Sequence, residues 1–264
     1  MLTAGQKMTN KIKCYLEIAR ELFCSLVFPK RCPVCDEILE PEELERGIHI
    51  TCESKLYPIL GAVCMHCGRP VGGENPMESI REYCYDCMQK SYDRKSYIAQ
   101  AKSLYLYKGA VKKTMYRLKY SNKREYASFF AKQAGNVHGR WMKQRKIEGI
   151  VPVPMYRRKQ QRRGYNQAES FAEELSKCTG IPVLKNVIRR TKDTIPQKGL
   201  DELQRKNNLK NAFHTGRNVV QYECVMVVDD IYTTGSTAEA VAQELLKNGA
   251  RRVYLMTICI GEDK

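Results

Sequence analysis

The chain has 264 residues, enough for one large domain or two smaller ones, and it carries a formal net charge of +16. Residues 1–95 hold 13 basic and 14 acidic residues, so the other 32 basic and 15 acidic residues give residues 96–264 a net charge of +17. Such a basic region favours phosphate-rich ligands or nucleic acid as partners, although about half of these charges fit an ordinary solvated surface.

Membrane and redox features of the sequence point to the cytoplasm. No stretch of about 18 apolar residues occurs, so we expect no membrane span. The N-terminus shows no charged-then-apolar leader with a small-residue cleavage site. Seven of the twelve cysteines lie between Cys32 and Cys87, in pairs at the spacing of metal ligands rather than of a disulfide framework. Thiolate ligands and the missing leader together predict a cytoplasmic protein.

Residues 1–30 form the first predicted segment, an amphipathic helix. Apolar residues recur at helical spacing from Ile12 to Leu26, and Pro29 ends the pattern. The apolar face could touch a membrane surface, but packing against the rest of the protein is the favoured interpretation.

Residues 31–95 contain two sets of four candidate zinc ligands and form the second predicted segment, a double zinc ribbon. Four protein ligands close a tetrahedral site and leave no open position, so the zinc is expected to be structural, and one or two ions are expected. The first set depends on His49, and pairs from different sets could also share an ion. His66 is interpreted as a bystander. The first set comprises Cys32, Cys35, His49 and Cys52, and the second comprises Cys64, Cys67, Cys84 and Cys87.

Residues 96–264 are the third predicted segment, and they begin with a strand over Ala101–Tyr107. A helix is predicted from Gly109 onwards and a second one over Tyr126–Met142. Tyrosines interleaved with lysines could stack the bases of a single strand, but half-buried packing is the favoured interpretation. These tyrosines are Tyr105, Tyr107, Tyr116 and Tyr120.

A short strand at Ile150–Pro154 is predicted to break into a turn, because neither of its prolines can donate to a sheet. A dense cationic run follows over residues 157–163, and then Gly164 to Ala168 open a helix that continues through Leu175. Five cations within seven residues, placed between a proline-fixed loop and a helix N-terminus, favour a clamp for a polyanion over a solvated turn.

The stretch from Val225 to Thr237 carries the strongest local pattern in the chain. Val225–Val228 is predicted as a buried parallel strand that ends in two carboxylates, Asp229 and Asp230. A hydroxyl-rich turn over residues 233–237 leads into a helix predicted over Ala238–Asn248, with Gly249 after it. The spacing of Ser236 and Glu239 predicts a capping box.

This pattern indicates a phosphate site beside a sugar site. Backbone N–H groups of the turn and of the helix N-terminus favour an anion, and Gly235 lets the backbone come close to it. The two carboxylates would repel that anion unless they face a neutral group rich in hydroxyls, such as a ribose diol. A ribose 5-phosphate moiety satisfies both halves, whereas a strand–turn–helix junction with simple caps is the alternative.

The whole pattern resembles the loop with which type I phosphoribosyltransferases bind phosphoribosyl pyrophosphate (PRPP). Val-Pro-Val-Pro at 151–154 and Arg-Arg-Gly-Tyr-Asn-Gln-Ala at 162–168 narrow the resemblance to the ComF family of ComFC- and GntX-like proteins. The stretch from Arg190 to Phe213 and the double zinc ribbon are also similar to that family. His49 departs from it, because the first ribbon more often has Cys there. The resemblance implies an α/β fold, a type I phosphoribosyltransferase-like parallel sheet flanked by helices after a small zinc-ribbon module.

The resemblance also implies a reaction, the transfer of phosphoribosyl from PRPP with release of pyrophosphate to an unknown acceptor related to a base or a nucleic acid. Positioning and cation stabilisation can suffice, with Mg²⁺ bound to substrate oxygens. Residues 190–211 correspond to a loop that closes over pyrophosphate. The alternative is a non-catalytic accessory protein of natural transformation that binds PRPP and single-stranded DNA. Competence proteins, such as a DNA-translocating helicase, are implied partners.

The expected catalytic residues are Asp229 and Asp230, holding the ribose hydroxyls directly or through Mg²⁺, with Arg163 and Arg190 at the pyrophosphate. The expected PRPP-binding residues are Val153, Pro154, Arg157, Asp229, Asp230, Thr233, Thr234, Gly235, Ser236 and Thr237.

Overall fold

The computed structural model describes residues 27–71, 82–93, 96–192, 209, 212–216 and 222–261. Contacts divide the chain into two compact units at Ser54/Lys55, so the two cysteine clusters fall in different units. Sequence analysis instead places both clusters in one segment, and its boundaries at 30 and 95 stay predictions. The helix expected over residues 12–26 and most of the expected loop at 190–211 lie outside the described residues. Every described helix is too short or too polar to cross a lipid bilayer.

The first unit is organised around a tight turn and two short helical segments. Arg31 and Ile38 pair as an antiparallel bridge on either side of the turn, and Asp36 lies in it with a φ of 72°. A 3₁₀ helix, η1, spans Pro41–Glu43, and helix α2 spans Ile50–Glu53. Ile48 and the first cluster's Cys32 are fully buried, so the metal ligands form much of this small interior.

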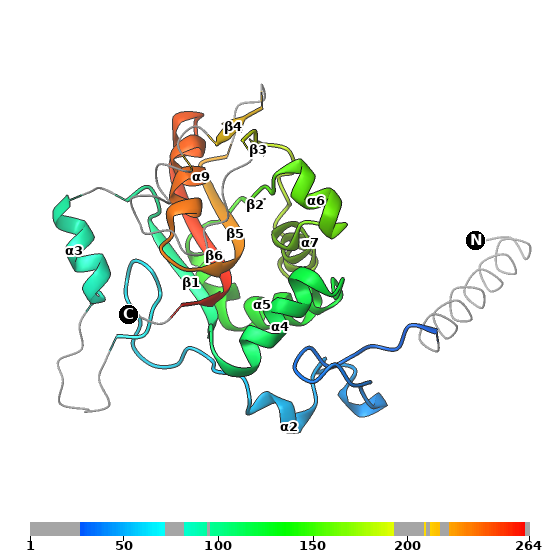
Figure 1. The fold of residues 1–264 in the computed structure, drawn as a ribbon. Helices are drawn as coiled ribbons and strands as arrows, with labels where there is room; N and C mark the ends of the chain where they lie inside the picture. Colours follow the sequence, from blue (N-terminus) through cyan, green and yellow to red (C-terminus); the bar gives the residue numbers. More distant parts are fainter. Residues whose placement is uncertain are drawn as a thin grey trace, which may run out of the picture. The chain divides into compact units, whose positions relative to one another are not determined.

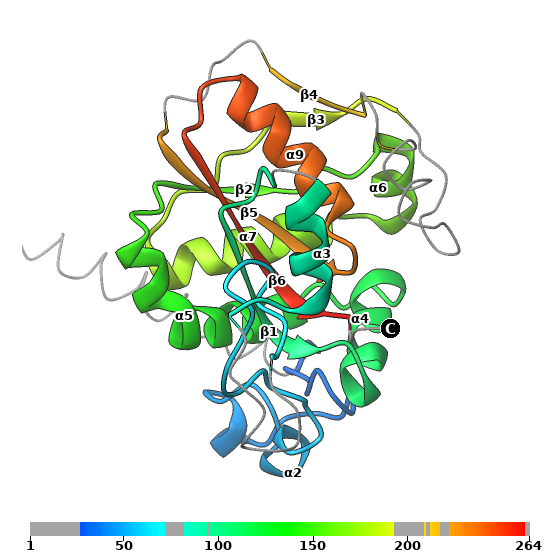
Figure 2. The ribbon, with the colours of Figure 1, turned by 90° about the vertical axis from the view of Figure 1, so that its left-hand side faces the viewer.

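The second unit is built on a four-stranded parallel sheet with the order β1-β6-β5-β2 (Figures 1 and 2). Strands β5 and β6 read as near-continuous apolar runs because both of their faces are covered. A parallel bridge between Ile150 and Val183 extends the pairing beyond β2. The strands are β1 Gln100–Leu106, β2 Gly149–Pro152, β5 Cys224–Tyr232 and β6 Arg252–Ile260.

Helices cover both faces of this sheet, which confirms the predicted fold class. Figure 2 shows α9 and α3 on one side of the sheet and α5 and α7 on the other. An antiparallel pair, β3 Ile188–Arg190 with β4 Phe213–Thr215, lies beside α9, where the Thr215 N–H donates to Glu244 at 3.3 Å. The helices are α3 Tyr85–Asp93, α4 Gly109–Tyr120, α5 Tyr126–Gln144, α6 Arg157–Arg163, α7 Gln167–Thr179 and α9 Ser236–Lys247.

The core of the second unit includes the second cysteine cluster. Cys64, Cys67 and Cys84 belong to the same buried apolar cluster as Val225 of β5 and Val241 of α9. Gly68 shows how close the contact is: it has a φ of +74°, and a Cβ there would lie 2.7 Å from the Ala101 carbonyl oxygen of β1. The second cysteine cluster is therefore packed into the α/β fold rather than tethered to it.

The chain elements differ from the predictions in two places. Strand β5 does not end at Val228 but continues through both carboxylates to Tyr232, because Asp229, Ile231 and Tyr232 keep their pairing with β6. The cationic run forms helix α6, and α7 begins at Gln167 rather than at Gly164. Helix α9 begins at Ser236, before the apolar pattern that starts at Ala238 and within the hydroxyl-rich turn, where the spacing of Ser236 and Glu239 placed its start.

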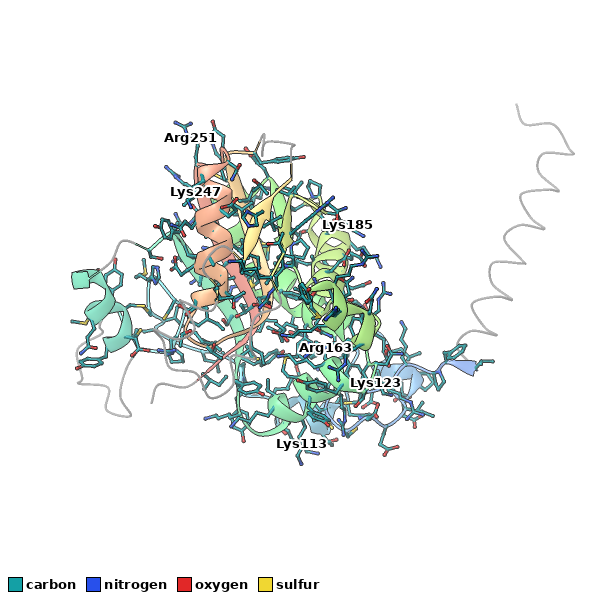
Figure 3. The ribbon with its side chains drawn as sticks, turned by 45° about the horizontal axis from the view of Figure 1, so that its top comes forward. Lys113, Lys123, Arg163, Lys185, Lys247 and Arg251 are labelled. Carbon is teal, nitrogen blue, oxygen red and sulfur yellow. The ribbon has the colours of Figure 1, made fainter. Side chains whose placement is uncertain are left out.

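The basic residues of the second unit are distributed over several elements. Figure 3 shows Lys113, Lys123 and Arg163 toward one end of this unit, and Lys247 and Arg251 at the opposite end. Lys247 is the last residue of α9, and Arg251 lies after this helix, where it pairs with Glu223 at 2.9 Å. Only part of the net charge is therefore available to any single anionic ligand.

Candidate functional site

Asp229 and Asp230 lie near the carboxyl end of β5, and each has a polar partner. The Asp230 backbone N–H donates to Asp229 Oδ1 at 2.9 Å. Lys119, in the last turn of α4, places its Nζ 2.7 Å from Asp230 Oδ2. Sequence analysis missed Lys119, because one lysine in a helix with several others carries no signal of its own.

Burial controls the charges of this group. Burial, together with the neighbouring negative charge of Asp230, raises the pKa of Asp229 to about 8. Burial acts to lower the pKa of Lys119, but the Asp230 carboxylate outweighs it and the pKa of Lys119 is raised. The three groups therefore form an ion pair, Lys119 with Asp230, beside a carboxyl group that resists ionisation.

The hydroxyl-rich turn connects β5 to α9 and depends on Gly235. This residue is the N-cap of α9 with a φ of 78°, and a Cβ there would lie 2.7 Å from the Tyr232 hydroxyl oxygen. Any other side chain at position 235 would be strained, because the backbone is left-handed and the Tyr232 ring is close. Within the turn, Thr234 Oγ1 and Ser236 Oγ are hydrogen-bonded at 2.8 Å. The turn thus brings its side-chain hydroxyls close to the first backbone N–H groups of α9.

The predicted capping box is wrong. Ser236 is the first helical residue of α9 rather than its N-cap. Glu239 directs its carboxylate to residues 96–97, where it accepts hydrogen bonds from the Ser96 hydroxyl and from the Tyr97 N–H at 2.9 Å. A distant segment therefore outcompetes the local cap for this side chain.

The Val-Pro-Val-Pro loop lies against the carboxyl end of β5. Pro152 pairs with Val228 in the sheet register, and the Val153 N–H donates to the Val228 carbonyl at 2.9 Å. Asn166 holds the other side of the loop, because its Nδ2 donates to the Val153 carbonyl at 3.0 Å while its Oδ1 caps α7 at Ala168. Val153 thus lies beside the Val228 end of the apolar run of β5, and the predicted role of Val153 and Pro154 in binding PRPP stays a prediction.

The predicted arginines lie in different settings. Arg163 stacks on the Tyr120 ring with its guanidinium carbon 4.9 Å from the centroid, and it donates to the Gln167 amide oxygen at 3.0 Å. Tyr120 follows Lys119, so Arg163 approaches the ion pair through α4. Arg157 is exposed in the first turn of α6. Arg190 lies in β3, where it is paired with Phe213 of β4 in the strand register and stacks on the Phe213 ring at 5.5 Å.

Both predicted metal sets are brought together, and they do not interleave. Within each set the potential ligand atoms all lie within 4.8 Å of one another. In the second set Cys67 and Cys84 have their Sγ atoms 3.5 Å apart, near the spacing of about 3.8 Å that Zn–S bonds of about 2.3 Å give in a tetrahedron. In the first set His49 Nδ1 faces Cys35 Sγ at 3.2 Å. The donor sets fit structural zinc.

Outer contacts orient the ligands of both clusters. His49 Nε2 lies 3.0 Å from the Ile38 carbonyl oxygen, an arrangement that directs Nδ1 toward a metal. His66 is more than a bystander, because its Nδ1 lies 3.4 Å from Cys87 Sγ and its Nε2 lies 3.1 Å from the Ile98 carbonyl oxygen. Its main chain also joins the sheet, since the Ala101 N–H donates to the His66 carbonyl at 2.6 Å.

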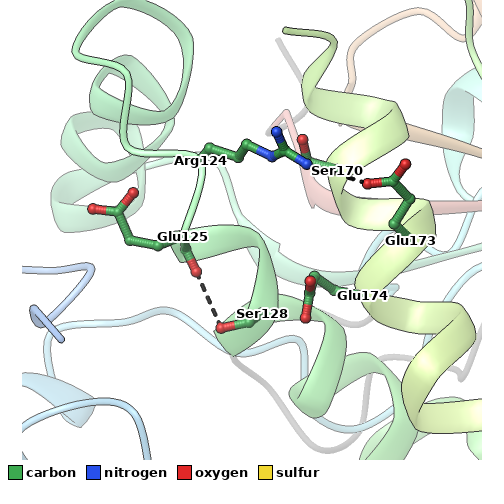
Figure 4. A pocket seen from close by; sticks show the side chains of 6 residues that line it. All are labelled: Arg124, Glu125, Ser128, Ser170, Glu173 and Glu174. Carbon is green, nitrogen blue, oxygen red and sulfur yellow. Dashed lines mark hydrogen bonds and ion pairs between the residues drawn. The ribbon is translucent and has the colours of Figure 1, made fainter. Parts of the chain in front are cut away.

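A separate hollow lies between α5 and α7 (Figure 4). Arg124 and Glu173 form an ion pair at 3.5 Å across it, and Glu174 also lines it. None of the residues predicted to bind PRPP lines this hollow. It is therefore not part of the candidate site.

The fold and the two cysteine clusters define an α/β protein with a double zinc ribbon, and comparison with known proteins agrees. The family model described as "Double zinc ribbon domain" matches residues 23–88. The chain is 31% identical over 204 residues to DNA utilization protein YhgH of Escherichia coli K12, covering 75% of this chain and 83% of that protein. It is 28% identical over 215 residues to competence protein ComFC of Bacillus subtilis, covering 80% and 82%. The chain belongs to the ComF family.

Other similarities are narrower. Competence protein F of Haemophilus influenzae is 43% identical over 110 residues, which span 41% of this chain and about half, 48%, of that protein. Two solved structures are also similar: a purine phosphoribosyltransferase from Pyrococcus horikoshii Ot3, at 19% identity, and an adenine phosphoribosyltransferase, at 18%. They cover 50% and 51% of this chain and 74% and 71% of their own, each with a TM-score of 0.33.

Replacing His49 tests the first cluster. The wild-type protein is expected to hold two zinc ions per chain, and His49→Ala is expected to hold one, because three thiolates then lack their fourth ligand. Metal analysis of the purified proteins measures the ratio, with the exposed His214→Ala as the matched control. Two ions per chain in the His49 variant would contradict the assignment of this ligand.

The raised pKa of Asp229 predicts a pH dependence of stability. Between about pH 4 and pH 8 the folded state binds more protons than the unfolded one, so ionising Asp229 costs stability as the pH rises, by at most about 1.4 kcal/mol per pH unit. Asp229→Asn removes this cost. We expect its melting temperature, relative to wild type, to rise steadily from pH 5 to pH 8. Glu174→Gln, at a partly exposed ion pair, should show a nearly constant difference, and a constant difference for Asp229→Asn would contradict the burial argument.

Proposed function

We propose that this protein binds PRPP and transfers its phosphoribosyl group to an acceptor with release of pyrophosphate. The observation that supports it best is the placement of the paired carboxylates only two residues before the hydroxyl-rich turn, on one strand–turn–helix unit. A phosphorylated ribose is a ligand that satisfies both, since its phosphate suits the turn and its diol suits the carboxylates.

In this proposal the turn over Thr233–Thr237 receives the 5-phosphate, and Asp229 and Asp230 receive the ribose hydroxyls. Lys119 has a role that favours the ligand, because its charge offsets that of Asp230 and so reduces repulsion of the phosphate. The high pKa of Asp229 also favours binding of the ligand, because a protonated carboxyl group can donate a hydrogen bond to a ribose oxygen.

The pyrophosphate end of PRPP is assigned to the loop at Val153 and Pro154 and to the cations after it, with Arg163 and Arg190 contributing charge. The chain needs no nucleophile of its own, because the bond to the ribose can break as negative charge gathers on pyrophosphate. Mg²⁺, when bound with PRPP, would offset the negative charge of the pyrophosphate group. The chain's own part is to hold the two ends of PRPP apart and in line.

A titration with PRPP tests the ribose assignment. Wild type is expected to bind PRPP in the presence of Mg²⁺, and Asp229→Asn/Asp230→Asn is expected to lose at least about tenfold in affinity, because the charged acceptor at Asp230 becomes neutral and the Asp229 carboxyl group is replaced by an amide. Isothermal titration calorimetry measures both, with Glu223→Gln at the other end of β5 as control. Unchanged affinity in the double variant would remove the assignment. Pyrophosphate release with a panel of bases, nucleosides and oligonucleotides then tests for transfer.

A second candidate function, binding of single-stranded DNA without catalysis, is favoured by the outer face of α4. Tyr116 and Tyr120 are 62% and 61% exposed, and their ring centroids lie 5.0 Å apart. Arg163 stacks on Tyr120, and a hollow beside Tyr116 is lined by Lys112, Lys113 and Arg117. Exposed stacked rings among cations suit successive bases and phosphates. The predicted half-buried packing is wrong for these two tyrosines, whereas Tyr105 is buried.

The exposed tyrosines provide the test of this candidate. Tyr116→Ala/Tyr120→Ala is expected to weaken binding of a labelled single-stranded oligonucleotide by about 30-fold or more, because two stacked bases are lost at about 1–3 kcal/mol each. Fluorescence anisotropy at two salt concentrations measures it, and Phe28→Ala removes another exposed aromatic ring as the control. Tight oligonucleotide binding with no pyrophosphate release would favour this function over transfer, and unchanged binding in the double variant would exclude this face.

A further inference from the structure

Arg69 connects the second cysteine cluster to the hydroxyl-rich turn. It follows Gly68 directly after the ligand pair Cys64 and Cys67, and its side chain is only 7% exposed. One guanidinium nitrogen donates to Asp86 Oδ2 at 2.7 Å, and the other donates to the Thr233 carbonyl at 3.4 Å. Asp86 itself lies between the ligands Cys84 and Cys87. One buried cation therefore contacts both halves of the metal site and the start of the turn.

The bond to the Thr233 carbonyl affects the direction of the next N–H group. The carbonyl of Thr233 and the N–H of Thr234 belong to one planar trans peptide, in which they point in opposite directions. A carbonyl held toward Arg69 therefore directs the Thr234 N–H to the other side of the turn. An anion site made of backbone N–H groups depends on this orientation.

A second set of contacts ties the segment after the cluster to α9. Glu239, in the first turn of α9, accepts from Ser96 and from the Tyr97 N–H at 2.9 Å. The Tyr97 hydroxyl is 2.9 Å from Gln243 Nε2, one turn further along α9. These contacts also draw the Glu239 carboxylate to residues 96–97, so it is not used as a cap at the helix N-terminus where a phosphate would bind.

The ring of Tyr232 fills the space between the cluster and the turn. It is buried in the same apolar cluster as Cys64 and Cys67, and its hydroxyl lies close to Gly235. The cluster also contacts β1, through Gly68 and through the main chain of His66. The cluster is thus in contact with the sheet, with Tyr232 and with the turn.

We propose that Arg69 is a positioning residue that sets the Thr233–Thr237 turn, and that metal in the second cluster holds Arg69 in place through Asp86. The phosphate that the turn receives rests on the proposed function, but the coupling of cluster and turn does not. A metal bound by both ligand pairs fixes the distance between Arg69 and Asp86, which belong to different pairs. Without the metal, no coordinate bond joins the two pairs.

The coupling is measured first without any ligand, by hydrogen–deuterium exchange of the full-length protein. Arg69→Met and Asp86→Asn are expected to speed exchange in residues 229–239 by about tenfold, the effect of losing one hydrogen bond from a charged donor. Asp86 is 49% exposed, so its replacement leaves the core intact. Arg69→Lys should restore part of the protection, because its ammonium keeps the positive charge but has a single nitrogen in place of the two guanidinium nitrogens that contact Asp86 and Thr233. Glu223→Gln, which removes an exposed ion pair elsewhere, is the control.

Zinc removal provides the decisive comparison. Mild chelation is expected to speed exchange in residues 229–239 of wild type, and to add little in Arg69→Met, because the link is already broken there. Additive effects, or an unchanged turn in both Arg69→Met and Asp86→Asn, would overturn the inference. A titration with PRPP then separates the two proposals. Binding that is about tenfold weaker in Asp86→Asn than in wild type supports both. If wild type binds no PRPP, the proposed function is wrong, and the exchange experiment alone tests the coupling.

Discussion

Two adjacent carboxylates at the end of a buried strand are the constraint around which this protein is built. An ionised carboxylate that loses water without a partner is too costly to keep, so each of the pair must be compensated. Asp230 is compensated by Lys119, and Asp229 by its raised pKa. The partner lysine fixes where the C-terminal end of α4 must lie. Tyr120, next to Lys119, then places Arg163, so one ion pair positions two further elements of the candidate site.

Local patterns predicted the parts of the molecule whose chemistry is contained in a short segment. The two cysteine sets assemble as their spacing predicted. The prediction failed where a side chain finds a partner far along the chain. Glu239 has the spacing of a cap, yet it binds residues more than 140 positions away. Lys119 and Arg69 were missed for the same reason, because nothing in a single sequence reports such distances.

The end of β5 shows a subtler failure. Polar residues after an apolar run predicted the end of the strand, because a buried carboxylate is costly. The strand does not end there, because the Lys119 charge compensates Asp230 and the raised pKa of Asp229 keeps that carboxyl group protonated. Pairing with β6 therefore runs through Asp229 to Tyr232, and the extra residues bring the Tyr232 ring under Gly235. A strand that ended at Val228 would leave the turn without this support.

The two halves of the double zinc ribbon have the same turn but different surroundings, and the two metal clusters therefore have different roles. The residue after each first ligand pair is left-handed, Asp36 with a φ of 72° and Gly68 with a φ of 74°. Aspartate tolerates that backbone, so the turn alone does not demand glycine. Gly68 is needed because Ala101 of β1 leaves no room for a Cβ. The first cluster stabilises its own small unit, whereas the second is part of the core that carries the turn, and the second is therefore placed to influence what the turn binds.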